Sequence, residues 1–127
     1  MKVLDTTFLV DLVNGKKETK KISNLPNLLT TQINMYEIIR GFFLKKIPLN
    51  KYLRIMEMFE NIRVLPLNDH GILKSAEISA SLINNGMVIE DADCLVAGIA
   101  LSHGIKTIVT KNKKHFSRIK GIKVQTY

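Results

Sequence analysis

Apolar residues recur along the chain in two alternating patterns, and each pattern predicts a different kind of element. Short apolar or β-branched runs, typical of buried strands, occupy residues 3–4, 28–31, 63–67, 107–110 and the neighbourhood of Val124. Apolar residues at helical spacing occupy the segments between these runs: residues 8–13, 35–43, 49–59, 69–85 and 91–103. Strands separated by helices predict an α/β domain with a mostly parallel sheet.

Polar residues at the expected helix ends refine these boundaries. Asn34 is the expected cap of the helix that begins at Met35, and Asn68 or Asp69 is the expected cap of the long helix that ends near residues 85–86. No repeat, low-complexity segment or linker interrupts the pattern. We therefore expect a single domain over residues 1–127.

The composition is that of a soluble globular protein, with 46% hydrophobic and 24% charged residues. The single cysteine, Cys94, cannot form an internal disulfide, and no apolar run approaches the roughly 18 residues that span a membrane. The N-terminus lacks the pattern of a secretion signal, so we expect a cytoplasmic protein without a membrane segment. The three histidines are isolated from one another, which argues against a structural zinc site.

The charge is strongly basic and unevenly distributed. Nineteen Lys and Arg oppose eleven Asp and Glu, giving a net charge of +8, and no acidic residue follows Asp93. This pattern is typical of a protein whose partner is a polyanion. The alternative for any one basic cluster, an ordinary solvated face, stays open at this point.

The few acids gather where chemistry is expected in a parallel sheet. Ligands bind at the carboxyl ends of the strands, and polar residues fall at these ends or in the helices that follow: Asp5, Glu37, Asp91, Asp93, Thr110 and Asn112. Each has an ordinary alternative as a helix cap, a surface residue or a turn residue. Carboxylates that converge repel one another unless a cation joins them, and hard oxygen ligands suit Mg²⁺ or Mn²⁺.

Four segments in order along the whole chain resemble the motifs of PIN-domain nucleases. They are Val3–Leu12, with Thr after Asp5; Thr31–Gly41, with Gly four residues after Glu37; Ile89–Leu101, with Asp93 before an alanine-bearing helix; and Thr107–Phe116, with the strand at Val124 beyond it. Each motif alone is unspecific. Four in order at suitable separations carry the resemblance.

The resemblance implies a three-layer α/β/α fold with a five-stranded parallel sheet and a magnesium site, which Mn²⁺ could also fill. It assigns metal coordination and catalysis to Asp5, Glu37 and Asp93. It assigns the orientation of the Asp5 carboxylate to hydroxyls: Thr7 and Thr110.

The chain departs from the family pattern at the position of a fourth acidic residue. Many members carry a further acid where Asn112 or His115 stands here, so this chain offers one carboxylate fewer for a second metal ion. Asp91 either supplies the missing carboxylate or caps its helix, and we favour the cap. Asp11 is interpreted as structural or peripheral, and His115 as a turn residue.

The activity implied by the resemblance is magnesium-dependent endoribonucleolytic hydrolysis of RNA phosphodiester bonds, in the manner of VapC-type toxins of toxin–antitoxin pairs. Basic side chains beyond the site would contact the RNA backbone: Lys111, Lys113, Lys114 and Arg118. The family also implies a homodimer and an antitoxin partner. Apolar helix positions are candidates for these contacts, with ordinary core packing as the alternative: Phe42, Phe43, Leu44, Leu53, Met56 and Phe59.

Three other functions stay open from the sequence. The chain could be a PIN-fold RNA-processing nuclease outside a toxin pair, or a catalytically silent RNA-binding module that kept the basic face. A receiver domain of signalling has a similar size and acidic pocket, but it needs a pair of adjacent acids after the first strand. Here Asp5 is followed by Thr6, which argues against that class.

Overall fold

The computed structural model describes all residues, 1–127, and its centre is a parallel sheet of five strands. The strands are β1 (Lys2–Leu4), β2 (Leu28–Thr31), β3 (Arg63–Leu65), β4 (Thr107–Val109) and β5 (Lys123–Gln125). They lie in the order β3-β2-β1-β4-β5, and every neighbouring pair is parallel. The predicted α/β class and all five predicted strands are confirmed.

The strand order places the first strand of the chain at the middle of the sheet. From β1 the chain builds outward to β2 and β3 on one side and returns to β4 and β5 on the other, so the order changes direction beside β1. Leu4 pairs with Val109, and the next residues, Asp5 and Thr110, leave the sheet side by side. This is the edge where open parallel sheets bind ligands.

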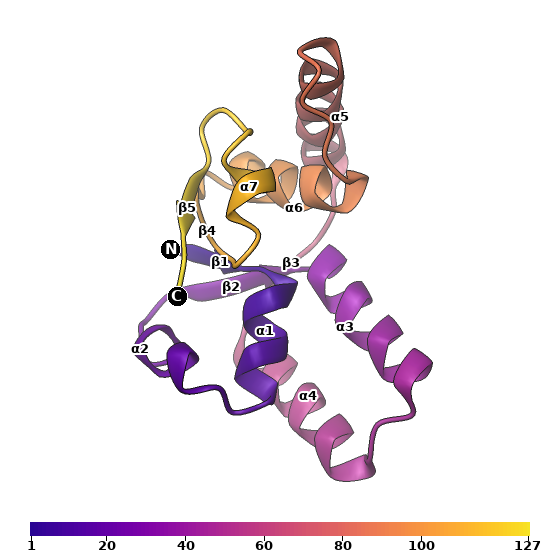
Figure 1. Ribbon diagram of the computed structural model, residues 1–127, viewed down its shortest axis with the longest axis vertical. Coiled ribbons are helices and arrows are strands. Elements are labelled where there is room, and N and C mark those ends of the chain that lie inside the picture. The colour runs from indigo at the N-terminus through magenta and orange to yellow at the C-terminus, as the bar shows by residue number, and fades with distance from the viewer.

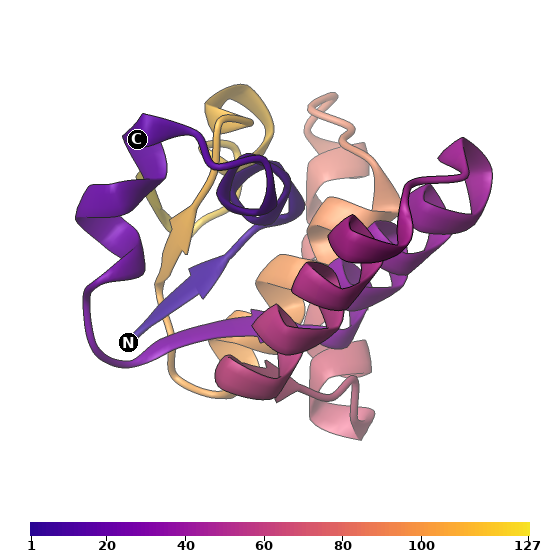
Figure 2. The ribbon, with the colours of Figure 1, turned by 90° about the horizontal axis from the view of Figure 1, so that it is seen from below.

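Helices cover both faces of the sheet (Figure 1). They are α1 (Thr6–Val13), α2 (Lys20–Ser23) with a preceding 3₁₀ turn (Lys17–Thr19), α3 (Gln32–Lys45), α4 (Leu49–Asn61), α5 (Asp69–Asn84), α6 (Asp91–Ser102) and α7 (Lys113–Phe116). Helices α5, α6 and α7 lie on one face. Seen from below, α1 lies between α2 on one side and α3 with α4 on the other (Figure 2). The three-layer α/β/α fold is thus confirmed.

Alternation along the strands divides the core between these two faces. Val3 and Ile108 point into the larger cluster, beneath α5, α6 and α7, whereas Leu4 and Val109 point into the smaller cluster, beneath α1, α3 and α4. Because strands with apolar side chains on both faces must be covered on both, the three layers follow from the apolar strand sequences.

Two helix caps can be compared with their predictions. Asn68 caps α5 as expected, since its Oδ1 accepts a hydrogen bond from the Gly71 N–H at 2.9 Å. The prediction for α3 was wrong: Thr31 is the cap, and its hydroxyl accepts from the Asn34 N–H at 3.3 Å. Asn34 is therefore already inside the helix, and its side chain is free for another role.

The preference for Asp91 as the cap of α6 was also wrong. Glu90 occupies the cap position, with extended backbone angles and no capping hydrogen bond from its side chain. Asp91 is the first residue of the helix, and its side chain is exposed. A carboxylate in the first turn still interacts favourably with the helix dipole.

The apolar candidates for protein contact separate into two groups. Phe43 and Leu44 on α3 are each 74% exposed and Leu53 on α4 is 56% exposed, whereas Met56 and Phe59 pack against the smaller core cluster. Ordinary core packing thus accounts for the second group but not for the first. No helix is long and apolar enough to span a membrane.

Candidate active site

Three carboxylates come from three different elements at the carboxyl edge of the sheet. Asp5 joins β1 to α1, Glu37 lies in the second turn of α3, and Asp93 lies in the first turn of α6. Their charges act on one another: Asp5 raises the pKa of Glu37 and of Asp93, and Asp93 raises that of Glu37. The fold therefore brings together the three acids to which metal coordination was assigned from the sequence.

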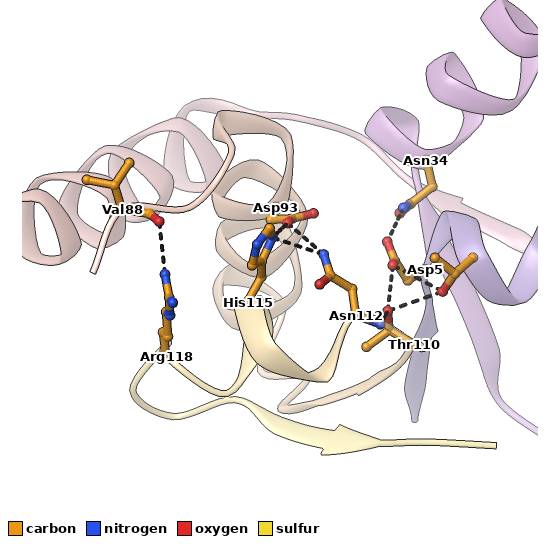
Figure 3. Close-up of polar contacts among 9 residues, drawn as sticks. Asp5, Asn34, Val88, Asp93, Thr110, Asn112, His115 and Arg118 are labelled. Carbon is orange, nitrogen blue, oxygen red and sulfur yellow. Dashed lines mark hydrogen bonds and ion pairs between the residues drawn. The ribbon is translucent and has the colours of Figure 1, made fainter. Parts of the chain in front are cut away.

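Asp5 is buried and receives several hydrogen bonds (Figure 3). Its Oδ2 accepts from the Thr110 hydroxyl at 2.7 Å, and its Oδ1 accepts from the Asn34 side-chain amide at 3.0 Å. The Thr7 hydroxyl is 3.5 Å from Oδ2 and lies nearer to the Thr110 hydroxyl, at 3.2 Å. Burial raises the pKa of Asp5, although these hydrogen bonds favour the charged form.

The Glu37 carboxylate accepts a hydrogen bond at Oε1 from the Thr6 hydroxyl, at 2.8 Å. The same Thr6 oxygen accepts from the Asn34 amide at 3.1 Å. Desolvation is the largest cause of the raised pKa of Glu37, and the charges of Asp5 and Asp93 act in the same direction.

Asp93 is held by two residues that follow β4 (Figure 3). Its Oδ2 accepts from the Asn112 side-chain amide at 3.1 Å and lies 3.0 Å from Nδ1 of His115. The Asn112 N–H donates to the Thr110 hydroxyl at 2.9 Å, which links this pair to the surroundings of Asp5. Burial raises the pKa of Asp93, while the contact with His115 opposes that effect.

The charges around these acids are not balanced by basic side chains. Neither Asp5 nor Glu37 forms an ion pair, and the only ion-pair partner of Asp93 is His115. Carboxylate oxygens are ligands that suit Mg²⁺, so the donor set fits this ion in type. In the present arrangement, however, no three Asp, Glu, His or Cys side chains converge closely enough to hold a metal ion.

Lys111, one of the residues expected at the RNA backbone, is engaged within the protein. Its ammonium group lies 3.0 Å from a carboxylate oxygen of Asp11 and 3.7 Å from one of Glu18. It also lies 5.0 Å from the centre of the Tyr127 ring, within the range of a cation–π contact. Its backbone N–H donates to the Thr7 hydroxyl at 3.0 Å, so both parts of Lys111 hold the loop after β4.

The other basic candidates differ in whether their side chains form bonds within the protein. The Arg118 guanidinium donates to the Val88 carbonyl at 3.0 Å and so ties the chain beyond α7 to the loop before α6 (Figure 3). Lys113 and Lys114 are exposed in α7 and form no ion pair. They are the two members of the set whose side chains form neither a hydrogen bond nor an ion pair within the protein.

Asp11 lies apart from the three acids, on α1. Its Oδ2 accepts a hydrogen bond from the Tyr127 hydroxyl at 2.7 Å, and this bond is the main reason that the pKa of Asp11 is lowered. Exposed Asp91 makes no hydrogen bond to this group of residues. The structure therefore brings neither of them into contact with Asp5, Glu37 or Asp93.

Comparison with known proteins decides the family. The family model described as PIN domain matches residues 2–122. The chain belongs to the PIN domain family.

Relatives of this PIN domain match over nearly their full length. It is 27% identical over 128 residues to a protein named ribonuclease VapC1 from Rickettsia felis, covering 98% of this chain and 94% of that one. A structure of VapBC-1 from nontypeable Haemophilus influenzae contains a chain 26% identical, with a TM-score of 0.84 and coverage of 98% and 96%.

The same fold occurs in a crystal structure of VapBC2 from Rickettsia felis bound to a DNA fragment from its promoter. The TM-score is 0.90, with 19% identity and coverage of 99% of this chain and 98% of that chain. At this identity the likeness supports the fold of this PIN domain rather than its activity.

Sequence reasoning missed three residues of this PIN domain that contact the acids: Asn34, Thr6 and His115. Asn34 lies three residues before Glu37 and hence on the same helix face, a signal that was overlooked because Asn34 was assigned as the helix cap. His115, interpreted as a turn residue, lies in α7 and contacts Asp93. Only the packing of α7 against α6 reveals that contact, because 22 residues separate the two side chains.

Proposed function

We propose that this PIN domain is a magnesium-dependent endoribonuclease that hydrolyses RNA phosphodiester bonds, with Mn²⁺ able to replace Mg²⁺. One observation carries the proposal: three carboxylates, Asp5, Glu37 and Asp93, lie at the carboxyl edge of the sheet without ion pairs to Lys or Arg, and the charge of Asp5 raises the pKa of the other two. A bound divalent cation would relieve this repulsion. The ribonuclease name of the Rickettsia felis relative supports the same activity.

Asp5, Glu37 and Asp93 would hold the metal ion. A bound divalent ion supplies a water of lowered pKa and neutralises charge that develops on the scissile phosphate. The chain's own part is positioning: Thr110 holds Asp5, while Asn112 and His115 hold Asp93. Small movements of these side chains would be needed, since the three acids do not yet meet at one point.

RNA would approach over α7. Lys113 and Lys114 lie beside Asn112 and His115 in the chain, so their charges stand close to the acidic site. Contacts of lysine with phosphate add affinity without sequence selectivity. We therefore assign the backbone contacts to Lys113 and Lys114, with a lesser part for Lys111 and Arg118, which are engaged within the protein.

The test is cleavage of labelled RNA by the purified protein, with Mg²⁺ or Mn²⁺ and then with EDTA. Asp5→Ala should abolish cleavage, and Asp11→Asn serves as the matched control because Asp11 bonds to Tyr127 away from the three acids. We expect the control to retain most activity. Cleavage that survives EDTA or Asp5→Ala would contradict the proposal.

A catalytically silent RNA-binding module is the competing function. Asp93→Asn separates the two, because it keeps the shape of the side chain while removing a charge from the site. A nuclease should lose at least about 100-fold in rate and still fold. A pure binder would keep its RNA affinity in both forms and never turn over.

We also propose that the protein is the toxin of a VapBC-type pair, acting in the cytoplasm as a homodimer that an antitoxin silences. The VapBC structures that share this fold support the partner, and exposed Phe43, Leu44 and Leu53 offer apolar surface for protein contacts. Native mass spectrometry of the protein co-expressed with its genomic neighbour tests both assemblies. An RNA-processing nuclease outside a toxin pair would give no such complex.

A further inference from the structure

We infer that Asn34 is a positioning residue whose single side-chain amide aligns both Asp5 and Glu37 for a divalent cation. The inference deepens the proposed function and rests on it. Asn34 is fully buried, at 0% exposure, and its side chain contacts Asp5 between β1 and α1, Thr6 of α1 and Thr31 of β2. The direction in which each proton of this network points shows which groups the amide serves.

The orientation of the Asn34 amide follows from its contact with the cap of α3. The Asn34 backbone N–H donates to the Thr31 oxygen at 3.3 Å, so the Thr31 hydroxyl proton is free to point elsewhere. It points to Asn34 Oδ1, 2.7 Å away. The amide oxygen therefore faces Thr31, and the NH₂ group faces the acids.

The two protons of this NH₂ group serve the two carboxylates. One is donated to Asp5 Oδ1 at 3.0 Å and the other to the Thr6 oxygen at 3.1 Å. Because the Thr6 oxygen accepts that proton, its own hydroxyl proton is directed to Glu37 Oε1, 2.8 Å away. The side-chain protons therefore run in one direction, from the Thr31 hydroxyl through the Asn34 amide to Asp5, and through Thr6 to Glu37.

This arrangement does more than a helix cap requires. Thr31 already caps α3 through its own hydroxyl, so the Asn34 amide is not needed to begin the helix. Polar side-chain atoms in the interior all have partners, which means that the network is fully satisfied and rigid. Hydrogen bonds that orient metal-binding carboxylates in this way typically change metal affinity by 10- to 100-fold when they are removed.

Three variants test the positioning role with a readout that does not require catalysis. Asn34→Leu removes both donors with little change in size. Thr6→Val removes the link from Asn34 to Glu37, on both sides of the Thr6 oxygen, and leaves the bond from Asn34 to Asp5 in place. Asn61→Leu, at the exposed end of α4, is the control, since Asn61 bonds only to the Glu57 carbonyl. Binding of Mn²⁺ without RNA is measured by isothermal titration calorimetry, and kcat and KM are measured separately.

We expect Asn34→Leu to weaken Mn²⁺ binding at least about tenfold and Thr6→Val about threefold, with kcat lowered and the KM for RNA unchanged. Asn61→Leu should match the wild type. Folded Asn34→Leu with wild-type Mn²⁺ affinity would overturn the inference. If that variant does not fold, Thr6→Val decides in the same way.

Mn²⁺ binding by the wild type separates a failure of the proposed function from a failure of the positioning role of Asn34. Wild-type protein that binds no Mn²⁺ contradicts the proposed function and this inference together. Wild-type binding that all three variants retain contradicts only the positioning role of Asn34.

Discussion

Each of the three acids lies in surroundings that favour its neutral form when no cation is present. Burial is the largest cause of the raised pKa of all three carboxyls: Asp5, Glu37 and Asp93. For Glu37 and Asp93, repulsion by the neighbouring carboxylates raises the pKa further. A carboxyl whose pKa is raised on folding binds its proton more tightly in the folded chain than in the unfolded chain. These three carboxyls therefore lower the free energy of unfolding at any pH at which they are ionised and no metal ion is bound.

The stability of the metal-free protein should therefore depend on pH in a known direction. For these three groups, the free energy of unfolding should fall as the pH rises from about 4, the usual carboxyl pKa, through the raised values. Mg²⁺ should restore it, and more at pH 7.5 than at pH 4.5. Melting curves at both pH values, with and without Mg²⁺, measure the effect.

Asp93→Asn isolates the contribution of one group, because other acids, such as Asp11 with its lowered pKa, change stability in the opposite sense. Without metal at pH 7.5 the variant should melt a few degrees above the wild type. It should also gain less from Mg²⁺. A variant that melts lower than the wild type at pH 7.5 and gains equally from Mg²⁺ would show that Asp93 carries no such cost.

At the scale of elements, helix α6 packs unusually closely on α5. A Cβ built on Gly98 of α6 would lie 2.7 Å from the Ser75 backbone nitrogen and 2.8 Å from its Cα. Since backbone cannot move aside as a side chain end can, Gly98→Ala should destabilise the protein by about 3 kcal/mol. Chemical denaturation of the variant measures the loss.

Gly41 provides the matched control in another helix. It lies inside α3, and a Cβ there would meet no atom within 4 Å. Gly41→Ala should therefore stabilise the fold by about 0.5–1 kcal/mol, through the higher helix propensity of alanine. Equal effects of the two substitutions would contradict the close packing of α5 and α6.

Tyr127, which follows β5, packs against helix α1 and forms a hydrogen bond to it. The Tyr127 hydroxyl donates to Asp11 at 2.7 Å, and its ring stands edge-on to Phe8 with centroids 4.9 Å apart. Tyr127→Phe keeps the ring and removes only the hydrogen bond to a charged group, so we expect a loss of about 1.5 kcal/mol near neutral pH. This loss should shrink as the pH falls and Asp11 is protonated, because the bond lowers the pKa of Asp11.

Elements were predictable where a local pattern determines them, and contacts were not. All five strands and the long helices follow from apolar periodicity, and the cap at Asn68 follows from its position before the helix. The cap of α3 was misassigned because Thr31 and Asn34 are both good caps, and only the end of β2 decides between them. The contact between His115 and Asp93 depends on tertiary packing, for which no local pattern exists.

The whole molecule carries a net charge of +8, and no acidic residue follows Asp93 along the chain. RNA affinity should therefore fall steeply as salt rises, because bound lysines release counterions from the phosphates. Lys113→Ala combined with Lys114→Ala should weaken binding and reduce the slope of log affinity against log salt by about 1.4, at about 0.7 for each phosphate contact on a single strand. Filter binding of labelled RNA at several salt concentrations measures the slope.

Lys106→Ala combined with Lys123→Ala is the control for this pair, since both lysines lie at the opposite ends of β4 and β5 from the acidic site. It removes the same charge and should leave the slope nearly unchanged. If the two double variants lower the slope equally, total charge rather than the surface of α7 governs RNA binding.

The central position of β1 has a consequence for the protein while it is being made. Strand β1 is synthesised well before its neighbour β4, and the Asp5 carboxylate acquires the Thr110 hydroxyl, 105 residues further along the chain, only after that segment has been made. Contacts between such distant segments form late, because a long loop must close before they are made. A nascent chain that has not yet reached Thr110 therefore lacks the hydroxyl that holds Asp5, and the Asn112 and His115 side chains that hold Asp93. We expect such a chain to leave the RNA that surrounds it on the ribosome uncut.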